Sequence, residues 1–217
     1  MKILEVKPRR KHISGIVFDC ELDLKEYGAE TDPAGLLALD SEVCEQKGLR
    51  SGLELSDEQL IELIRESSVK RAKSRAMWYL SRQDMPREKL CRKLKEHFPE
   101  YAAEAAADRA VELGFINDFE YAKRRLQLEL EVKKASLRAA VAKLQAEGVD
   151  RETMEAAVQE VEYNPTDSIL MLIEQKYSRK LEEENGKDKV FAALQRKGYS
   201  YSQIKAAFNA LEDDWND

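Results

Sequence analysis

A pattern of apolar residues and glycine recurs after 50 positions without a gap, and it constrains the fold more than any other feature of the chain. Each aligned pair matches apolar to apolar or glycine to glycine. The pairs are Val141 with Phe191, Leu144 with Leu194, Gly148 with Gly198, Val149 with Tyr199, Met154 with Ile204, Ala157 with Ala207, Val158 with Phe208 and Val161 with Leu211. A repeat of this length indicates a supersecondary unit that stacks on its neighbours.

The repeated pattern describes two helices joined by a tight turn. Apolar residues spaced by three or four form one helix face, and the glycine that follows can adopt the left-handed conformation of a helix C-cap. A capping residue then opens the next helix: Asp150 in one copy, and Ser200 with Gln203 in the other. The same segment therefore predicts a helix pair twice.

An earlier copy precedes these two. Leu94 aligns with Leu144 at a shift of 50. In the second helix of this copy, the shift is 47: Ala107, Ala110 and Val111 align with Met154, Ala157 and Val158. Its second helix is rich in alanine, which predicts close helix packing. A further helix precedes each copy, over residues 71–83, 119–132 and 166–181.

These patterns predict a mainly α-helical fold, with three tandem three-helix repeats that form an elongated, curved body and a small N-terminal β-containing head. The expected segments are a mixed head with a β-hairpin (1–55), a connecting helix (56–69), repeat 1 (70–118), repeat 2 (119–163), and repeat 3 with an acidic tail (164–217). In the head, the side chains of residues 2–7 and 12–19 alternate loosely in the manner of β-strands, and the basic residues between them predict a turn. Residues 36–46 predict a helix, and Ser56 with Gln59 forms a capping box.

The charge of the chain is unevenly distributed. The formal net charge is −6, yet residues 70–95 carry ten basic and only two acidic side chains. Such a block indicates a surface for phosphates or for an acidic partner. The alternative is a solvated helix pair whose charges are neutralised by the acidic segment 99–120. A second basic cluster follows at 123–138, and the two clusters could line one face of the repeats.

No chemistry-bearing motif stands out. The chain lacks a phosphate-binding glycine loop and has only two histidines, His12 and His97, so no metal, cofactor or catalytic group is expected. Its three cysteines show no Cys-x-x-Cys spacing, and we find neither a signal peptide nor a long apolar run, which predicts a cytoplasmic, non-membrane protein. Trp78 and Tyr79 lie on an amphipathic helix, which favours core positions, and the sequence shows no platform for stacking bases.

Four strings of residues resemble the RecX family across residues 70–211. They are Ala76-Met77-Trp78-Tyr79-Leu80-Ser81-Arg82 with Leu90 and Leu94, Leu113-Gly114-Phe115-Ile116-Asn117-Asp118 with Tyr121 and Ala122, Leu144 with Gly148-Val149, and Lys197-Gly198-Tyr199-Ser200. The head is similar to the β-containing extension of longer members. The chain departs from the family pattern in reading Lys133-Lys134-Ala135 where Lys-Gly is frequent, and in being acidic overall.

This resemblance implies a non-enzymatic regulator that binds the RecA filament along its groove, and we expect the protein to be a monomer. It would inhibit recombinase, ATPase and co-protease activity in DNA repair and the SOS response. Because the chain is acidic, we expect any direct binding to single- or double-stranded DNA to be weak. Two alternatives remain open: a helical-repeat scaffold for another protein, and a DNA-binding regulator that uses residues 70–95. The candidate interface residues are Arg75, Arg82, Arg87, Lys89, Arg92, Lys93, Lys123, Arg124, Lys133, Lys134 and Arg138.

Overall fold

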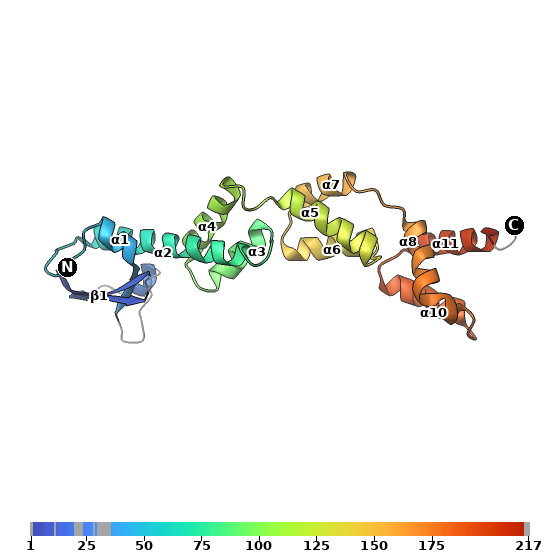
Figure 1. Ribbon diagram of the computed structural model, residues 1–217, viewed down its shortest axis with the longest axis horizontal. Coiled ribbons are helices and arrows are strands. Elements are labelled where there is room, and N and C mark those ends of the chain that lie inside the picture. Colours follow the sequence, from blue (N-terminus) through green and yellow to red (C-terminus); the bar gives the residue numbers. More distant parts are fainter. Residues whose placement is uncertain (1, 11, 20–23, 28, 30–35, 215–217) are drawn as a thin grey trace. The chain divides into compact units, whose positions relative to one another are not determined.

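The computed structural model describes residues 2–10, 12–19, 24–27, 29 and 36–214 of the 217-residue chain. It is mainly helical with a small three-stranded antiparallel sheet near the N-terminus, which confirms the predicted fold class (Figure 1). The chain divides into two compact units, Met1–Ile116 and Asn117–Asp217. The five-segment division expected from the sequence stays a prediction.

The first unit begins with the sheet, whose strands follow the order β1-β2-β3. The elements of this unit are β1 (Lys2–Arg10), β2 (Ile13–Asp19), the 3₁₀ turn η1 (Leu24–Tyr27), β3 (Leu37–Asp40), α1 (Ser41–Gln46), α2 (Asp57–Leu80), α3 (Arg87–Lys95) and α4 (Glu100–Glu112). The β1–β2 hairpin follows the predicted strands. The long helix α2 opens with the predicted capping box, in which Ser56 accepts from the Gln59 N–H and Gln59 accepts from the Ser56 N–H.

Two sequence expectations for the first unit are wrong. Residues 37–40 form a strand rather than the start of a helix, because they pair with β2; all four residues are buried, and Leu37 and Leu39 join the sheet core. The connecting helix and the first helix of repeat 1 are one continuous helix, α2, since neither glycine nor proline interrupts Asp57–Leu80.

The alanine-rich helix α4 packs closely on α2, as the composition predicts. All of Ala102, Ala103, Ala106, Ala107 and Ala110 are buried, and they share a core with apolar side chains of α2 and α3. Small side chains allow two helix backbones to approach each other. The sheet has a separate core with the N-terminal half of α2, so this helix serves two cores of the same unit.

The second unit contains the two best-matched repeats, each with its own core. Its elements are α5 (Asp118–Gln127), η2 (Leu128–Val132), α6 (Leu137–Glu147), α7 (Arg151–Gln159), α8 (Pro165–Leu172), η3 (Ile173–Tyr177), α9 (Ser178–Leu181), α10 (Gly186–Arg196) and α11 (Tyr201–Asp214). Both η2 and η3 are π-helical turns that extend the first helix of a repeat. The last residues of the acidic tail, 215–217, lie outside the described residues.

The glycine turns form as the repeat pattern predicts. Gly148 and Gly198 have φ angles of 102° and 91°, and the residue after each donates its N–H to the carbonyl of Leu144 or Leu194. Asp150 caps α7, and Ser200 caps α11 together with Gln203.

The turn at Gly198 also joins the two repeats of the second unit. The hydroxyl of Tyr199 donates to the Lys134 carbonyl at 3.1 Å, and the Ser136 N–H donates to the Lys197 carbonyl at 3.4 Å. A Cβ on Gly198 would lie 2.5 Å from the Ser136 hydroxyl oxygen, which caps α6. Glycine is therefore required here both by its backbone angle and by the neighbouring helix start.

Gly198→Ala tests this double requirement. We expect a loss of about 2–3 kcal/mol in the free energy of unfolding, because the left-handed backbone and the disturbed Ser136 cap both contribute. Gly114→Ala is the matched control: Gly114 has a φ of 74° but open space around it, so only about 1 kcal/mol should be lost. Urea unfolding of both variants measures the difference, and equal losses would contradict the contact between the repeats.

Candidate partner and nucleic-acid interface

The C-terminal half of α2 carries a row of three arginines and a tryptophan. Arg71, Arg75, Trp78 and Arg82 follow one another at intervals of four, three and four residues, which places them on one side of the helix and its end. The opposite side presents Ala72 and Ala76, both buried in the core. The helix therefore buries small residues and leaves its large cationic and aromatic side chains outside.

Trp78 is 44% exposed, so the prediction that it lies in the core is wrong. The guanidinium carbon of Arg82 lies 4.0 Å from the centroid of its ring, and that of Arg75 lies 5.5 Å away. Tyr79, in contrast, is half-buried against the core of α2–α4 and meets Trp78 edge-on at 5.2 Å. The ammonium of Lys93, on α3, lies 5.2 Å from the Tyr79 ring.

Part of the basic block is neutralised by α4, as the alternative interpretation predicts. Arg87 donates to Asp108 at 2.7 Å, and Lys95 lies 2.6 Å from Glu100 and 3.1 Å from Glu104. The hydrogen bonds to Glu100 and Glu104 raise the pKa of Lys95. These cations therefore help to hold α3 on α4.

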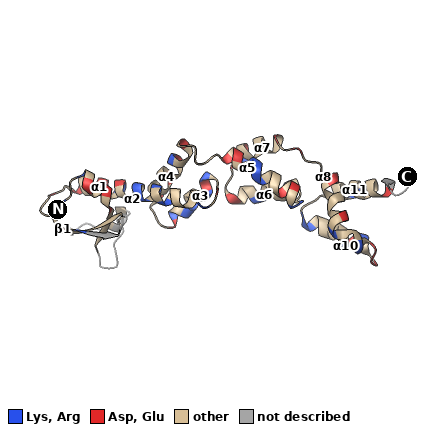
Figure 2. Ribbon diagram, in the orientation of Figure 1, with Lys and Arg blue, Asp and Glu red and all other residues tan. Residues whose placement is uncertain are grey.

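Three other cations of the block differ from this paired group. Within the part of the chain that the structure describes, Arg75, Arg82 and Lys93 form no ion pair with a carboxylate and contact aromatic rings instead. Lys89 is half-buried and Arg92 is exposed on α3. Figure 2 shows basic positions along α2 and α3. We call Arg71, Arg75, Trp78 and Arg82 the arginine–tryptophan row.

The candidates of the second unit are mostly engaged within that unit. Lys123 pairs with Glu160 at 2.8 Å, and Lys133 with Glu129 at 2.7 Å. Arg124 is exposed and donates to the carbonyl of Glu120. Lys134 and Arg138 are the other two candidates. Lys134 has a φ of 49° and offers its carbonyl to Tyr199, whereas Arg138 is exposed on α6. Whether the two basic clusters line one face stays a prediction.

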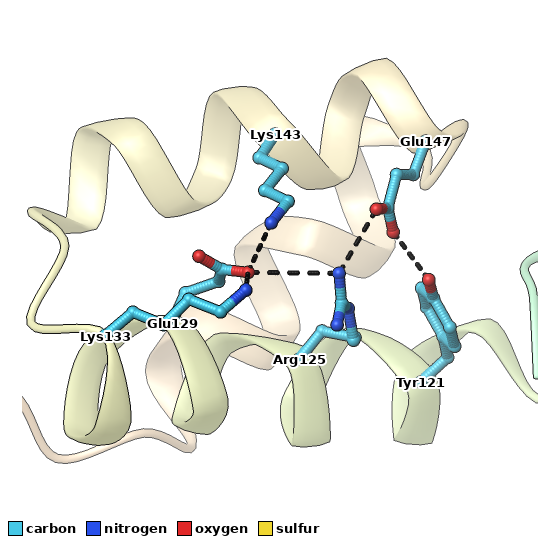
Figure 3. A network of polar contacts seen from close by, with 6 residues as sticks. All are labelled: Tyr121, Arg125, Glu129, Lys133, Lys143 and Glu147. Carbon is cyan, nitrogen blue, oxygen red and sulfur yellow. Dashed lines mark hydrogen bonds and ion pairs between the residues drawn. The ribbon is translucent and has the colours of Figure 1, made fainter.

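A buried carboxylate organises a polar network between α5, η2 and α6 (Figure 3). Glu129 is only 5% exposed; its carboxylate accepts from Lys133 at 2.7 Å and from Lys143 at 2.6 Å, and Arg125 lies 3.8 Å away. Burial raises the pKa of Glu129, but the hydrogen bonds from the two lysines outweigh burial and hold that pKa below its ordinary value. Arg125 continues the network to Glu147 at 3.2 Å.

Tyr121 closes the other end of this network. Its hydroxyl donates to Glu147 at 2.5 Å, and burial, followed by this contact with a carboxylate, raises the pKa of the tyrosine. The network therefore links two helices of repeat 2 through groups that are charged or hydrogen-bonded at neutral pH. Its cations contribute to the stability of the second unit.

The described residues offer no metal site, and neither of their two cysteines is activated. They contain no group of three or more His, Cys, Asp or Glu side chains placed to hold a metal. Cys44 and Cys91 are buried, and burial raises the pKa of both thiols, that of Cys44 to about 11. A protonated thiol is a poor nucleophile. None of the described helices is long and apolar enough to cross a membrane.

The fold and the exposed cationic and aromatic side chains define a helical-repeat protein with a surface suited to binding. No protein-family model matches the chain. It is similar to the regulatory protein RecX of Clostridioides difficile, with 26% identity over 83% of this chain and 86% of that protein, and to the regulatory protein RecX of Bacillus subtilis, with 27% identity over 81% of this chain and 68% of that protein.

Two solved structures have the same fold. A crystal structure of a regulatory protein RecX matches 96% of this chain and 98% of its own, with a TM-score of 0.64 and 21% identity. The structure of RecX from Lactobacillus salivarius matches 67% of this chain and 97% of its own, with a TM-score of 0.59 and 22% identity. With the curated relatives, these likenesses support the assignment of the chain to the RecX family.

Glu129→Gln tests the buried network. At pH 7 we expect a loss of about 1–2 kcal/mol in the free energy of unfolding, a modest value because Lys133 and Lys143 keep 46% and 41% of their side chains exposed and can be rehydrated. The folded-state pKa of Glu129 is lowered, so its contribution is present above the unfolded pKa of about 4.3 and is lost as the pH falls through the folded value.

The control for this prediction is Glu131→Gln, which removes an exposed carboxylate two residues away. It should leave stability unchanged within about 0.5 kcal/mol. Denaturant unfolding followed between pH 7 and pH 3 compares the two variants with the parent protein. A Glu129→Gln loss that is as large at pH 3 as at pH 7 would show that the carboxylate charge is not the cause.

Proposed function

We propose that this protein is a regulator of the RecA recombinase that binds the recombinase filament and inhibits its ATPase, strand-exchange and co-protease activities. The observation that carries the proposal is the likeness to proteins named regulatory protein RecX over more than four fifths of the chain. The protein acts by binding alone, without catalysis. Three cations that form no ion pair with a described carboxylate, Arg75, Arg82 and Lys93, face the filament and its DNA.

The geometry supports a binding role for the first unit. Cations that lack carboxylate partners attract an acidic surface without first breaking an internal ion pair, and guanidinium groups recognise carboxylates and phosphates through several N–H donors. Arg75, Arg82 and Lys93 meet this condition, whereas Arg87 and Lys123 are already paired. Two other functions remain as outcomes of the tests: a scaffold for a different protein and a regulator that acts on DNA alone.

The first test is the DNA-dependent ATP hydrolysis of the cognate RecA, titrated with this protein. We expect strong inhibition well below one molecule per recombinase subunit, because one molecule bound along a filament affects several subunits. Absence of any effect at several-fold excess of folded protein would contradict the proposal and favour the scaffold.

A charge-reversal variant tests which surface is used. One triple variant combines Arg75→Glu, Arg82→Glu and Lys93→Glu. It should raise the half-inhibitory concentration about tenfold or more, because attraction becomes repulsion at the contact. The control variant reverses Lys73, Arg196 and Lys205, which are exposed elsewhere and change the net charge equally. Equal effects of the two triple variants would show that only net charge matters.

A further inference from the structure

The arginine–tryptophan row has the geometry of a linear binding site. At 1.5 Å per residue, Arg71 and Arg75 are separated by about 6 Å along the helix, and Arg75 and Trp78 by about 4.5 Å. Arg82 follows in the turn just after the helix ends at Leu80. Cations in a line with an aromatic ring between them match a chain of regularly spaced anions that carries flat groups.

Contacts within the row pre-organise its side chains. The Arg82 guanidinium carbon lies over the Trp78 ring at 4.0 Å from its centroid, and this contact restrains the arginine side chain without using its N–H groups in an ion pair. Arg71 is held at the other end, where it donates to the Ala38 carbonyl at 3.4 Å and lies 5.9 Å from the Phe98 ring. Less side-chain entropy is lost when a ligand binds groups that are already held.

A surface hollow adjoins the row. Its lining consists of Arg71, Ser74, Arg75 and Trp78 of α2, together with His12, Ile13, Asp40 and Phe98. The lining thus combines an imidazole and two aromatic rings with hydroxyl and guanidinium donors, and it includes one carboxylate. Such a hollow can accept a planar heterocycle from one side, with donors at its edge.

We propose that the arginine–tryptophan row is a binding site for single-stranded DNA, in which a base stacks on the Arg82–Trp78 pair and the guanidinium groups of Arg75 and Arg82 bind neighbouring phosphates. The inference rests on the proposed function, because it assigns the DNA of the filament to the surface proposed to face it. Bases stack on aromatic rings and on guanidinium planes alike.

The exposed stack favours a single strand over other anionic partners. In a duplex, the flat faces of the bases are covered by their neighbours, so an indole on the surface gains no stacking. An acidic protein surface would pair with the arginines but does not carry a flat group beside each anion, as a single strand does. The row therefore provides both interactions that a single strand requires.

Direct binding without recombinase tests the proposal. The probe is a fluorescently labelled oligothymidylate of about 16 nucleotides, followed by anisotropy, with Kd expected in the micromolar range at moderate salt. Trp78→Ala should weaken binding roughly five- to hundredfold, and Trp78→Phe should restore most of it. Arg75→Ala and Arg82→Ala should each lower the slope of log K against log salt by about 0.7.

Three controls separate stacking from charge and folding. Lys73→Ala removes an exposed cation from another face of α2 and should change Kd less than twofold. An abasic strand of the same length should bind the parent and Trp78→Ala equally, because it has no base to stack. A duplex and polyglutamate should bind without dependence on Trp78, and circular dichroism checks that each variant is folded.

Either of two results would overturn the proposal: an oligothymidylate affinity that is unchanged in Trp78→Ala, or polyglutamate that binds as tightly as the oligonucleotide. The second would assign the row to an acidic protein surface.

The recombinase ATPase assay distinguishes failure of this inference from failure of the proposed function. Inhibition that survives in Trp78→Ala without strand binding would leave the proposed function standing, and strand binding without inhibition would remove the proposed function alone.

Discussion

The left-handed glycine turn is the constraint on which the rest of the structure depends. It occurs at Gly48, Gly114, Gly148 and Gly198, and each time the N–H of the next residue is bonded to a carbonyl five residues earlier. The helices that these turns end have between 6 and 13 residues. Helices of that length are marginal alone, so their stability comes from the turn that returns the chain and lets neighbouring faces pack.

The last of these turns has a second role that the others lack. In repeat 2 the glycine is followed by Val149, which packs only into its own core, whereas in repeat 3 it is followed by Tyr199. The tyrosine ring fills the equivalent place and its hydroxyl reaches Lys134, whose left-handed backbone presents the carbonyl. One substitution within a repeated motif thus converts a turn that closes a helix pair into a turn that also joins two repeats.

The sequence predicts the features that depend on local chemistry. Helix caps at Ser56, Asp150 and Ser200, and the turns at Gly148 and Gly198, follow from residues a few positions apart. Features set by distant partners are not predictable in this way. Residues 37–40 have an ambiguous pattern, and only pairing with β2 makes them a strand. The exposure of Trp78 could have been predicted from the sequence. Arginines occupy the positions seven and three residues before it and four after it, which places Trp78 on a charged side of the helix. The ion pairs that neutralise Arg87 and Lys123 required the fold itself.

An acidic protein can still bind an anion through such a row, because electrostatic interactions at the surface are local. The Debye length is about 8 Å at physiological salt, so carboxylates farther away barely weaken the attraction between a phosphate and Arg75 or Arg82. The net charge of −6 acts on long-range encounter rather than on contact. Internal pairing therefore does more than stabilise helices: it engages Arg87, Lys95, Lys123 and Lys133, whereas Arg75 and Arg82 beside the exposed indole of Trp78 form no ion pair with a described carboxylate. Specificity for a flat, negatively charged chain follows from which cations are left without carboxylate partners, and not from how many cations the chain contains.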